Sequence, residues 1–174
     1  MESSQLSEPE IKPVEALEKA GIPFIRLTHP AAYTMELCRG IGAEYGARHC
    51  KNLFLANKHG TRFFLYLTDP DKPYRTSEVS RRLGSTRLSF GAAEQLSLVL
   101  GARQGAVSVM ALTNECAKEN NRKGVLTVAV DEAILSWERL CVHPNTDTAT
   151  LVITPKDLIR FLEYYGIGYV IVGS

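Results

Sequence analysis

The stretch of residues 50–55 (CKNLFL) constrains the fold of this chain most, because a lysine enters an apolar run near its start. Lys51 precedes Leu53-Phe54-Leu55-Ala56, which has the composition of a core strand. Side chains alternate along a strand, so we expect Lys51 on the same face as Leu53 and Leu55. A lysine on such a face either extends into water or points into a pocket. The plain alternative is a solvated lysine at the end of a strand.

Segments with strand and helix patterns alternate along the rest of the chain. We expect strands at residues 24–27, 52–56, 62–67, 106–112, 125–130, 140–143, 148–153 and 169–172. We expect helices at residues 8–20, 34–38, 77–83, 90–100, 131–135 and 155–165, with turns at 57–60 and 120–124. The interleaving of hairpins and helices predicts a mixed α/β fold with a mixed sheet and packed helices, not a doubly wound parallel sheet. A length of 174 residues suits one domain over 1–174.

The charge of the chain limits its possible partners. The formal net charge is only +1, so any contact with RNA requires a local basic patch. The most basic section carries Lys72, Arg75, Arg81, Arg82 and Arg87. A charge run of this kind is typical of a solvated helix face, and the functional alternative is a patch that contacts the phosphates of RNA.

Several classes of protein are disfavoured. Residues 1–5 are polar and acidic, unlike a secretory signal, and no apolar run approaches the ~20 residues of a membrane span. The four cysteines form no C-x-x-C pair, which favours reduced thiols in the cytoplasm and no zinc site. The motifs of P-loop enzymes, serine hydrolases and zinc proteases are missing. The sequence therefore predicts neither a metal nor a cofactor.

A few polar residues remain as candidates for a site. His143 ends an expected strand and precedes a rigid proline, although a lone histidine is more often structural. Gly101 and Gly105 bracket a loop whose backbone N–H groups could meet an oxyanion, although most such pairs are only turns. Cys50 is better explained by core packing than by thiolate chemistry.

Three ordered segments carry a resemblance to a known family. They are KNLFL at 51–55, GAVS at 105–108 and HPNTDTAT at 143–150. Together they resemble the YbaK / prolyl-tRNA synthetase-associated editing domain family, and most of all its branch of free-standing alanyl-tRNA(Pro) deacylases. The resemblance runs from about Gly21 to the C-terminus. Two departures, Val109-Met110 in place of the usual Pro-Phe and Asp147 in place of asparagine, affect the shape of the pocket.

The resemblance implies a curved mixed sheet flanked by helices and a trans-editing hydrolase. Such an enzyme cleaves the ester that joins a wrong amino acid, here alanine, to proline tRNA. Lys51 would hold the terminal phosphate or the ester, and backbone N–H groups near Gly105 and Ala106 would face the carbonyl oxygen. His143 and Met110 would wall a small pocket. A hydroxyl of the substrate ribose could orient the water, so no general base of the protein is required.

The resemblance also implies a substrate-binding set and leaves alternatives open. The set comprises Asn52, Ser108, Met110, Asp147 and Thr148. Ser108 and Thr148 could instead support the polar side chain of cysteine, serine or threonine, as in sister branches. A non-catalytic tRNA-binding module of the same fold is the other alternative. Prolyl-tRNA synthetase or an elongation factor could help to select the tRNA, and no membrane partner is expected.

Overall fold

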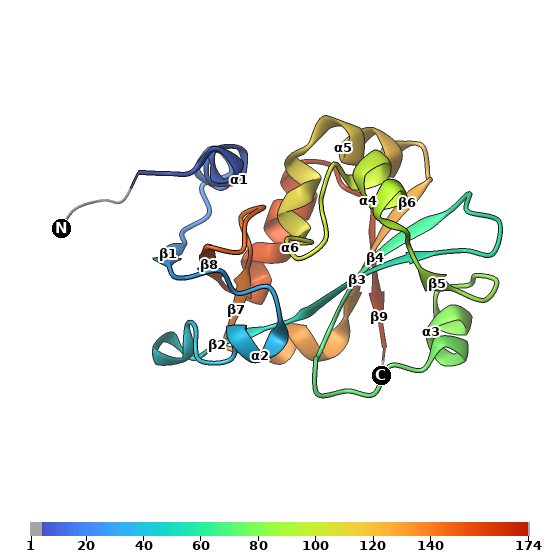
Figure 1. The fold of residues 1–174 in the computed structure, drawn as a ribbon, viewed down its shortest axis with the longest axis horizontal. Coiled ribbons are helices and arrows are strands. Elements are labelled where there is room, and N and C mark those ends of the chain that lie inside the picture. The colour runs from blue at the N-terminus through green and yellow to red at the C-terminus, as the bar shows by residue number, and fades with distance from the viewer. Residues whose placement is uncertain (1–4, 174) are drawn as a thin grey trace.

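The nine strands of the described residues form two mixed sheets (Figure 1). This computed structural model describes residues 5–173, so most of the polar start at 1–5 lies outside it. The first sheet has the order β1 (Ile25–Thr28), β8 (Ala149–Ile153), β7 (Arg139–Val142) and β2 (Ala47–His49). The second has the order β5 (Ser89–Phe90), β3 (Lys51–Ala56), β4 (Phe63–Thr68), β6 (Leu126–Asp131) and β9 (Tyr169–Val172). The mixed α/β class is confirmed, with two sheets where one was expected.

Both sheets combine parallel and antiparallel pairs. The expected hairpin of β3 and β4 is present, with Lys51 opposite Thr68 and Ala56 opposite Phe63. Strands β4, β6 and β9 are parallel, and β6 lies between the other two. In the first sheet β2 runs parallel to β7, which places His49 beside Cys141.

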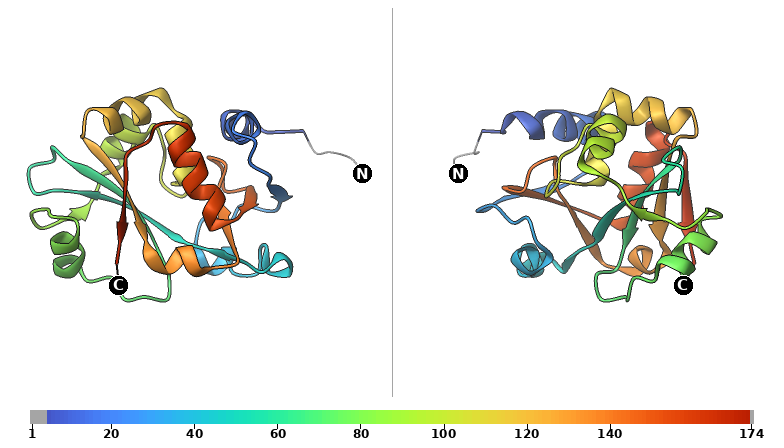
Figure 2. Two further views of the ribbon diagram at one scale, coloured as in Figure 1. Left: turned by 180° about the vertical axis from the view of Figure 1, so that it is seen from behind. Right: turned by 45° about the vertical axis from the view of Figure 1, so that its right-hand side comes forward.

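The helices lie on different sides of the sheets. They are α1 (Glu8–Lys19), α2 (Met35–Cys38), α3 (Thr76–Arg82), α4 (Ala93–Leu100), α5 (Glu115–Arg122) and α6 (Pro155–Tyr164). Short 3₁₀ helices add η1 (Ala43–Tyr45), η2 (Val109–Thr113) and η3 (Glu132–Ser136). Figures 1 and 2 show α4, α5 and α6 grouped together, with α3 apart from them beside β5. None of the helices within residues 5–173 is long and apolar enough to cross a bilayer.

Strand β3 serves two apolar clusters, as its alternating side chains require. Phe54 and Ala56 pack in the main core, which includes residues of both sheets and of α1, α4, α5 and α6. Leu53 and Leu55 pack on the opposite face, in a smaller cluster with Val79 of α3. Lys51 therefore starts a strand that is buried on both faces along most of its length.

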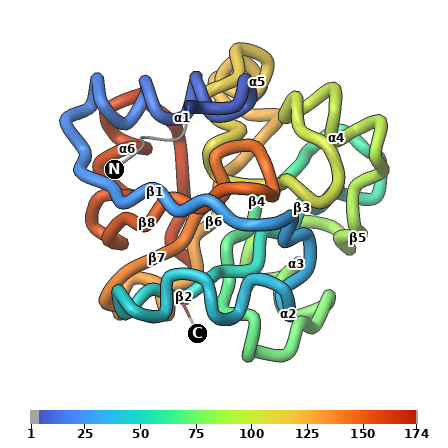
Figure 3. Tube along the Cα trace, turned by 60° about the vertical axis from the view of Figure 1, so that its left-hand side comes forward, coloured from blue at the N-terminus to red at the C-terminus, as the bar shows by residue number. Residues whose placement is uncertain are grey.

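Cys50 connects the two sheets. The chain leaves the first sheet at His49 and enters the second at Lys51, with the buried Cys50 between them. Strand β2 and helix α2 lie on the side of the molecule away from α1 and α5 (Figure 3). The start of β3 is thus placed where the two sheets meet.

Two of the expected elements differ from the structure, and one helix was not expected. Residues 106–112 form no strand; they lead into η2, where the Ser108 Oγ accepts a hydrogen bond from the Met110 N–H at 3.1 Å. Phe90 belongs to β5, and the helix that was expected from 90 begins at Ala93. Helix α5 was not expected, because only Ala117 among its residues is buried and the sequence shows no apolar stripe.

Candidate active site

A cavity of about 200 Å³ opens at the junction of the two sheets. Strand β2 contributes His49 and strand β3 contributes Lys51 and Asn52. The rest of the lining is Ala32, Tyr33, Thr34, Met35, Cys38, Cys50, Gly105, Val107, Cys141 and His143. Segments that are far apart in the sequence therefore meet around the start of β3.

Lys51 is exposed, but it lies at the cavity and not away from it. It lines the cavity together with Gly105 and His143, the two residues that the sequence resemblance assigned to the same site. It also lines a second cavity of about 210 Å³ on the α3 side, with Thr68, Lys72 and Arg75. Within residues 5–173 its ammonium group makes no hydrogen bond or ion pair, so its charge is available to a bound anion.

Two histidines and a cysteine face one another in the cavity. The Cys38 Sγ lies 3.8 Å from the His143 Nε2, and the ring centroids of His49 and His143 are 6.0 Å apart. Burial lowers the pKa of His49, which the hydrogen bond to the Ile41 carbonyl only partly offsets. Burial likewise lowers the pKa of His143, against a raising effect of the Ala149 backbone. Both imidazoles are therefore neutral at pH 7.

The thiols of the cavity are protonated. Burial raises the pKa of Cys50 to about 12 and that of Cys141 to about 12. Burial also raises the pKa of Cys38. A protonated thiol is a weak nucleophile, so none of the three is suited to covalent catalysis. For Cys50 this agrees with core packing, since its exposed fraction is 4%.

In the loop before η2, one of the two expected positions lines the cavity and the other does not. The Ala106 N–H donates to the Arg103 carbonyl at 3.2 Å, and the buried Ala106 lines another cavity. Gly105 is exposed with φ of +85°, and Val107 is half-buried; both line the cavity at the sheet junction. Neither of their N–H groups has a partner within the described chain. Ala106 therefore does not line the cavity in which it was expected, whereas Gly105 and Val107 do.

The remaining substrate-binding candidates lie outside the cavity, apart from Asn52. Met110 is fully buried in the main core, so the expectation that it walls the pocket is wrong. Ser108 is 1% exposed and caps η2. The Asp147 carbonyl accepts from the Ala32 N–H at 2.8 Å, and the Thr148 carbonyl accepts from the His29 N–H at 3.0 Å. These two residues hold the segment that carries Ala32 against the first sheet.

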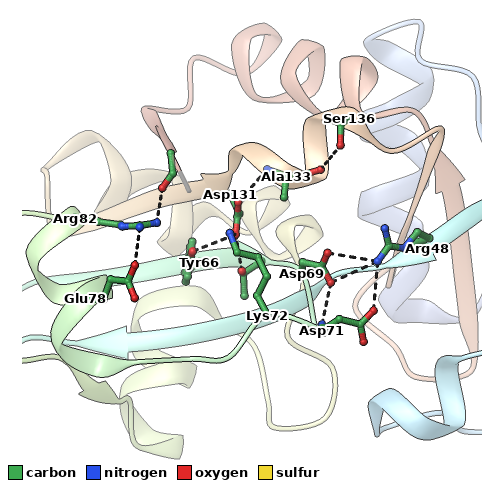
Figure 4. Close-up of polar contacts among 12 residues, drawn as sticks. Arg48, Tyr66, Asp69, Asp71, Lys72, Glu78, Arg82, Asp131, Ala133 and Ser136 are labelled. Atoms are coloured by element: carbon green, nitrogen blue, oxygen red, sulfur yellow. Dashed lines mark hydrogen bonds and ion pairs between the residues drawn. The ribbon is translucent and has the colours of Figure 1, made fainter.

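Two residues of the basic section have structural partners (Figure 4). The Lys72 Nζ lies 2.8 Å from the Oδ2 of Asp131, whose side chain is buried. Arg82 pairs with Glu78 at 2.6 Å and donates to the Gly173 carbonyl. Arg75, Arg81 and Arg87 are exposed. Lys72 is therefore paired with a buried carboxylate, whereas the pair of Arg82 with Glu78 lies at the surface.

Sequence reasoning missed His49, Cys38 and Val107. His49 reaches the cavity because β2 pairs with β7, and this three-residue parallel contact has no local sequence signal. Cys38 ends the short helix α2, which was expected, but nothing in its surroundings indicates the partner it meets. Val107 is the third residue of the GAVS segment, where only the glycine and the alanine were considered.

A comparison with known protein families identifies the family of this chain. The family model described as "Aminoacyl-tRNA editing domain" matches residues 29–161, which include all three signature segments. The chain belongs to the aminoacyl-tRNA editing domain family. The resemblance seen in the sequence is thereby confirmed.

Relatives within the aminoacyl-tRNA editing domain family are similar over most of their length. The chain is 28% identical over 153 residues to the prolyl-tRNA editing protein ProX of Acetoanaerobium sticklandii, covering 88% of this chain and 90% of that protein. It is 32% identical over 151 residues to the prolyl-tRNA synthetase associated domain-containing protein 1 of Danio rerio, covering 86% and 78%.

A solved structure shares the fold. The crystal structure of a proposed trans-editing enzyme for prolyl-tRNA synthetase matches with a TM-score of 0.68 and 21% identity. The match covers 98% of this chain and 99% of that chain. The two-sheet architecture is therefore a fold that this editing domain shares with an experimentally determined structure.

Proposed function

We propose that this protein is an aminoacyl-tRNA deacylase that acts in trans on mischarged tRNA(Pro), with alanine as the amino acid removed. One observation carries the proposal: Lys51, Gly105 and His143, which lie on three segments of the chain, line a single small cavity. The relatives named for prolyl-tRNA editing and for association with prolyl-tRNA synthetase support this choice of tRNA.

Lys51 supplies the positive charge that the reaction requires. It lines both the cavity at the sheet junction and the neighbouring cavity on the α3 side, where Arg75 lies. An aminoacyl ester in the first cavity would leave the terminal phosphate of the tRNA near the second. The Lys51 ammonium group would then attract the phosphate and fix the ester in the first cavity.

Backbone N–H groups would stabilise the developing oxyanion. Gly105 and Val107 line the cavity, and their N–H groups have no partner within the described residues. Donors that are already in place cost no reorganisation when charge develops on the carbonyl oxygen. Because the aminoacyl ester is already activated, a water oriented by the substrate ribose hydroxyl completes the reaction. The neutral His49 and His143 then act as walls.

Size exclusion explains why a separate editing enzyme is useful. A synthetase site that holds proline rejects the smaller alanine weakly, since one or two methylenes are worth only ~1–3 kcal/mol. A second pocket that is too small for proline supplies the missing selectivity. In this protein His143 and Val107 are the residues of the wall that would exclude the proline ring.

The setting of the reaction follows from the same proposal. We assign the protein to the cytoplasm and treat residues 1–174 as one domain. Prolyl-tRNA synthetase or an elongation factor would deliver the charged tRNA, because a net charge of +1 gives the protein little long-range attraction for RNA.

Hydrolysis of matched charged tRNAs tests the proposal. We expect rapid release of alanine from alanyl-tRNA(Pro) and slow release of proline from prolyl-tRNA(Pro), with alanyl-tRNA(Ala) showing how far the tRNA body matters. Faster hydrolysis of cysteinyl-, seryl- or threonyl-tRNA would move the protein to a sister branch. Binding of alanyl-tRNA(Pro) without turnover would instead indicate a non-catalytic tRNA-binding module.

A further inference from the structure

Three potential metal ligands converge in the cavity, although their spacing in the sequence is not that of a zinc motif. The ligand atoms of Cys38, His49 and His143 all lie within 4.8 Å of one another. They come from α2, from β2 and from the residue after β7. Cys38 is buried, the two histidines are half-buried, and all three residues line the cavity.

The distances approach those of a tetrahedral site. With Zn–S of about 2.3 Å and Zn–N of about 2.0–2.1 Å, the sulfur–nitrogen edge of a tetrahedron is about 3.6 Å. The Cys38 Sγ and the His143 Nε2 are 3.8 Å apart, which nearly equals that edge. The other two pairs lie within 4.8 Å and need to close by at most about 1.5 Å to reach tetrahedral edges.

The hydrogen bonds around the histidines favour metal binding. The His49 Nε2 lies 2.9 Å from the Ile41 carbonyl oxygen, which can only accept, so Nε2 carries the proton and Nδ1 carries the lone pair. A metal-bound histidine usually donates its other N–H to a carbonyl or carboxylate in this way. The His143 Nε2 faces the Cys38 sulfur, and its Nδ1 is buried.

We propose that Cys38, His49 and His143 bind one divalent transition metal ion, with zinc as the best match. One thiolate with two imidazoles is a ligand set that suits zinc and disfavours magnesium or calcium. Binding releases the thiol proton of Cys38, and a water from the cavity fills the fourth position. A bound ion would also occupy the space of the aminoacyl group and inhibit hydrolysis. This last consequence rests on the proposed function, whereas the binding itself does not.

Cobalt(II) titration tests the site directly, because cobalt reports its coordination by absorption. The full chain, reduced and freed of metal, should bind one equivalent of cobalt with the intense visible bands of a tetrahedral site and a thiolate charge-transfer band. Cys38→Ser should abolish the charge-transfer band and weaken binding more than roughly 100-fold, beyond the loss caused by removing an outer partner. Serine keeps a donor for the Ala32 carbonyl, which Cys38 now contacts at 3.4 Å.

Two further variants make the result specific. Cys116→Ser removes a half-buried cysteine of α5, outside the cavity, and should leave the spectrum unchanged. His49→Gln should weaken cobalt binding and keep the charge-transfer band at saturation. Absence of cobalt binding by the parent chain, or an unchanged spectrum in Cys38→Ser, would overturn the proposal. Since absorption reads the metal itself, these outcomes are independent of whether the protein hydrolyses any tRNA.

Discussion

At the scale of single residues, Lys51 differs from the nearby Lys58 in its surroundings. Lys51 lines two cavities, whereas Lys58 is exposed in the turn between β3 and β4. We expect Lys51→Ala to lower kcat/KM for alanyl-tRNA(Pro) by about 100- to 1,000-fold, as for loss of one preorganised electrostatic group. Thermal unfolding should not change, because the side chain is exposed. Lys58→Ala is the matched control, and a similar activity of both variants would remove the role of Lys51.

His143 determines how wide the pocket is. Its ring is one wall of the cavity, and truncation would leave room for a larger amino acid. We expect His143→Ala to raise hydrolysis of prolyl-tRNA(Pro) relative to alanyl-tRNA(Pro) by about 10- to 200-fold, the range for a change of one methylene. His59→Ala, a change at an exposed turn residue, should leave this ratio as it is. An unaltered preference for alanine in His143→Ala would show that another residue excludes proline.

The two buried imidazoles also make stability depend on pH. Burial lowers the pKa of His49 and of His143, so the unfolded chain binds more protons than the native protein just below pH 6.5. We expect the free energy of unfolding to fall as the pH drops from 7.5 to 5.5, with each histidine contributing at most about 1.4 kcal/mol per pH unit.

Denaturant unfolding at both pH values, with a chelator present, measures this effect. His143→Gln should flatten the pH dependence relative to the parent chain. Equal pH dependence in the variant and in the parent chain would contradict the assignment.

At the scale of elements, the loop before η2 depends on one glycine conformation. Gly105 has φ of +85°, and an added Cβ would meet the Tyr33 Cβ at an ordinary 3.5 Å. Alanine there costs about 1–2 kcal/mol through its backbone alone. Gly84 has φ of +64° with open space around it, so Gly84→Ala should cost a similar amount. We expect hydrolysis of alanyl-tRNA(Pro) to fall only in Gly105→Ala. A similar loss of activity in both variants would indicate a general effect of stability.

Local signals in the sequence predicted the elements whose ends carry caps. Thr154 accepts from the Asp157 N–H at 3.1 Å and starts α6 as its Thr-Pro-x-Asp pattern predicts. The prediction of a strand at 106–112 was wrong because all five residues of η2 are buried. A continuous apolar run has no period that separates a strand from a short helix. Helix α5 was missed for the opposite reason, since it has almost no apolar face.

Long-range pairing set the limit on predicting the site. Lys51 and Asn52 were expected on opposite faces of β3, yet both line the cavity because it surrounds the start of the strand. His49 reaches the same cavity because β2 pairs with β7. Ala106 does not line the cavity, and its N–H donates to the Arg103 carbonyl. Such contacts depend on residues far away in the chain, which one sequence does not reveal.

At the scale of the whole molecule, the net charge is too small for strong long-range attraction of RNA. The net charge of +1 makes local basic residues decisive, and the exposed Arg75, Arg81 and Arg87 remain after Lys72 and Arg82 are paired with carboxylates. Figures 1 and 2 show their helix α3 and the segment after it far from α5. Phosphate contacts on this side would therefore leave the α5 side free for a protein partner.

Replacing two of these arginines should weaken tRNA binding without changing the chemical step. We expect Arg81→Ala/Arg87→Ala to raise KM for alanyl-tRNA(Pro) with kcat unchanged, and to reduce the slope of log KM against log salt by roughly 1.5, the value for two lost phosphate contacts. Arg122→Ala/Lys156→Ala removes the same charge from exposed positions on α5 and α6. Steady-state kinetics across a salt series compares the two variants. Equal salt slopes would mean that net charge alone acts, and that the tRNA binds elsewhere.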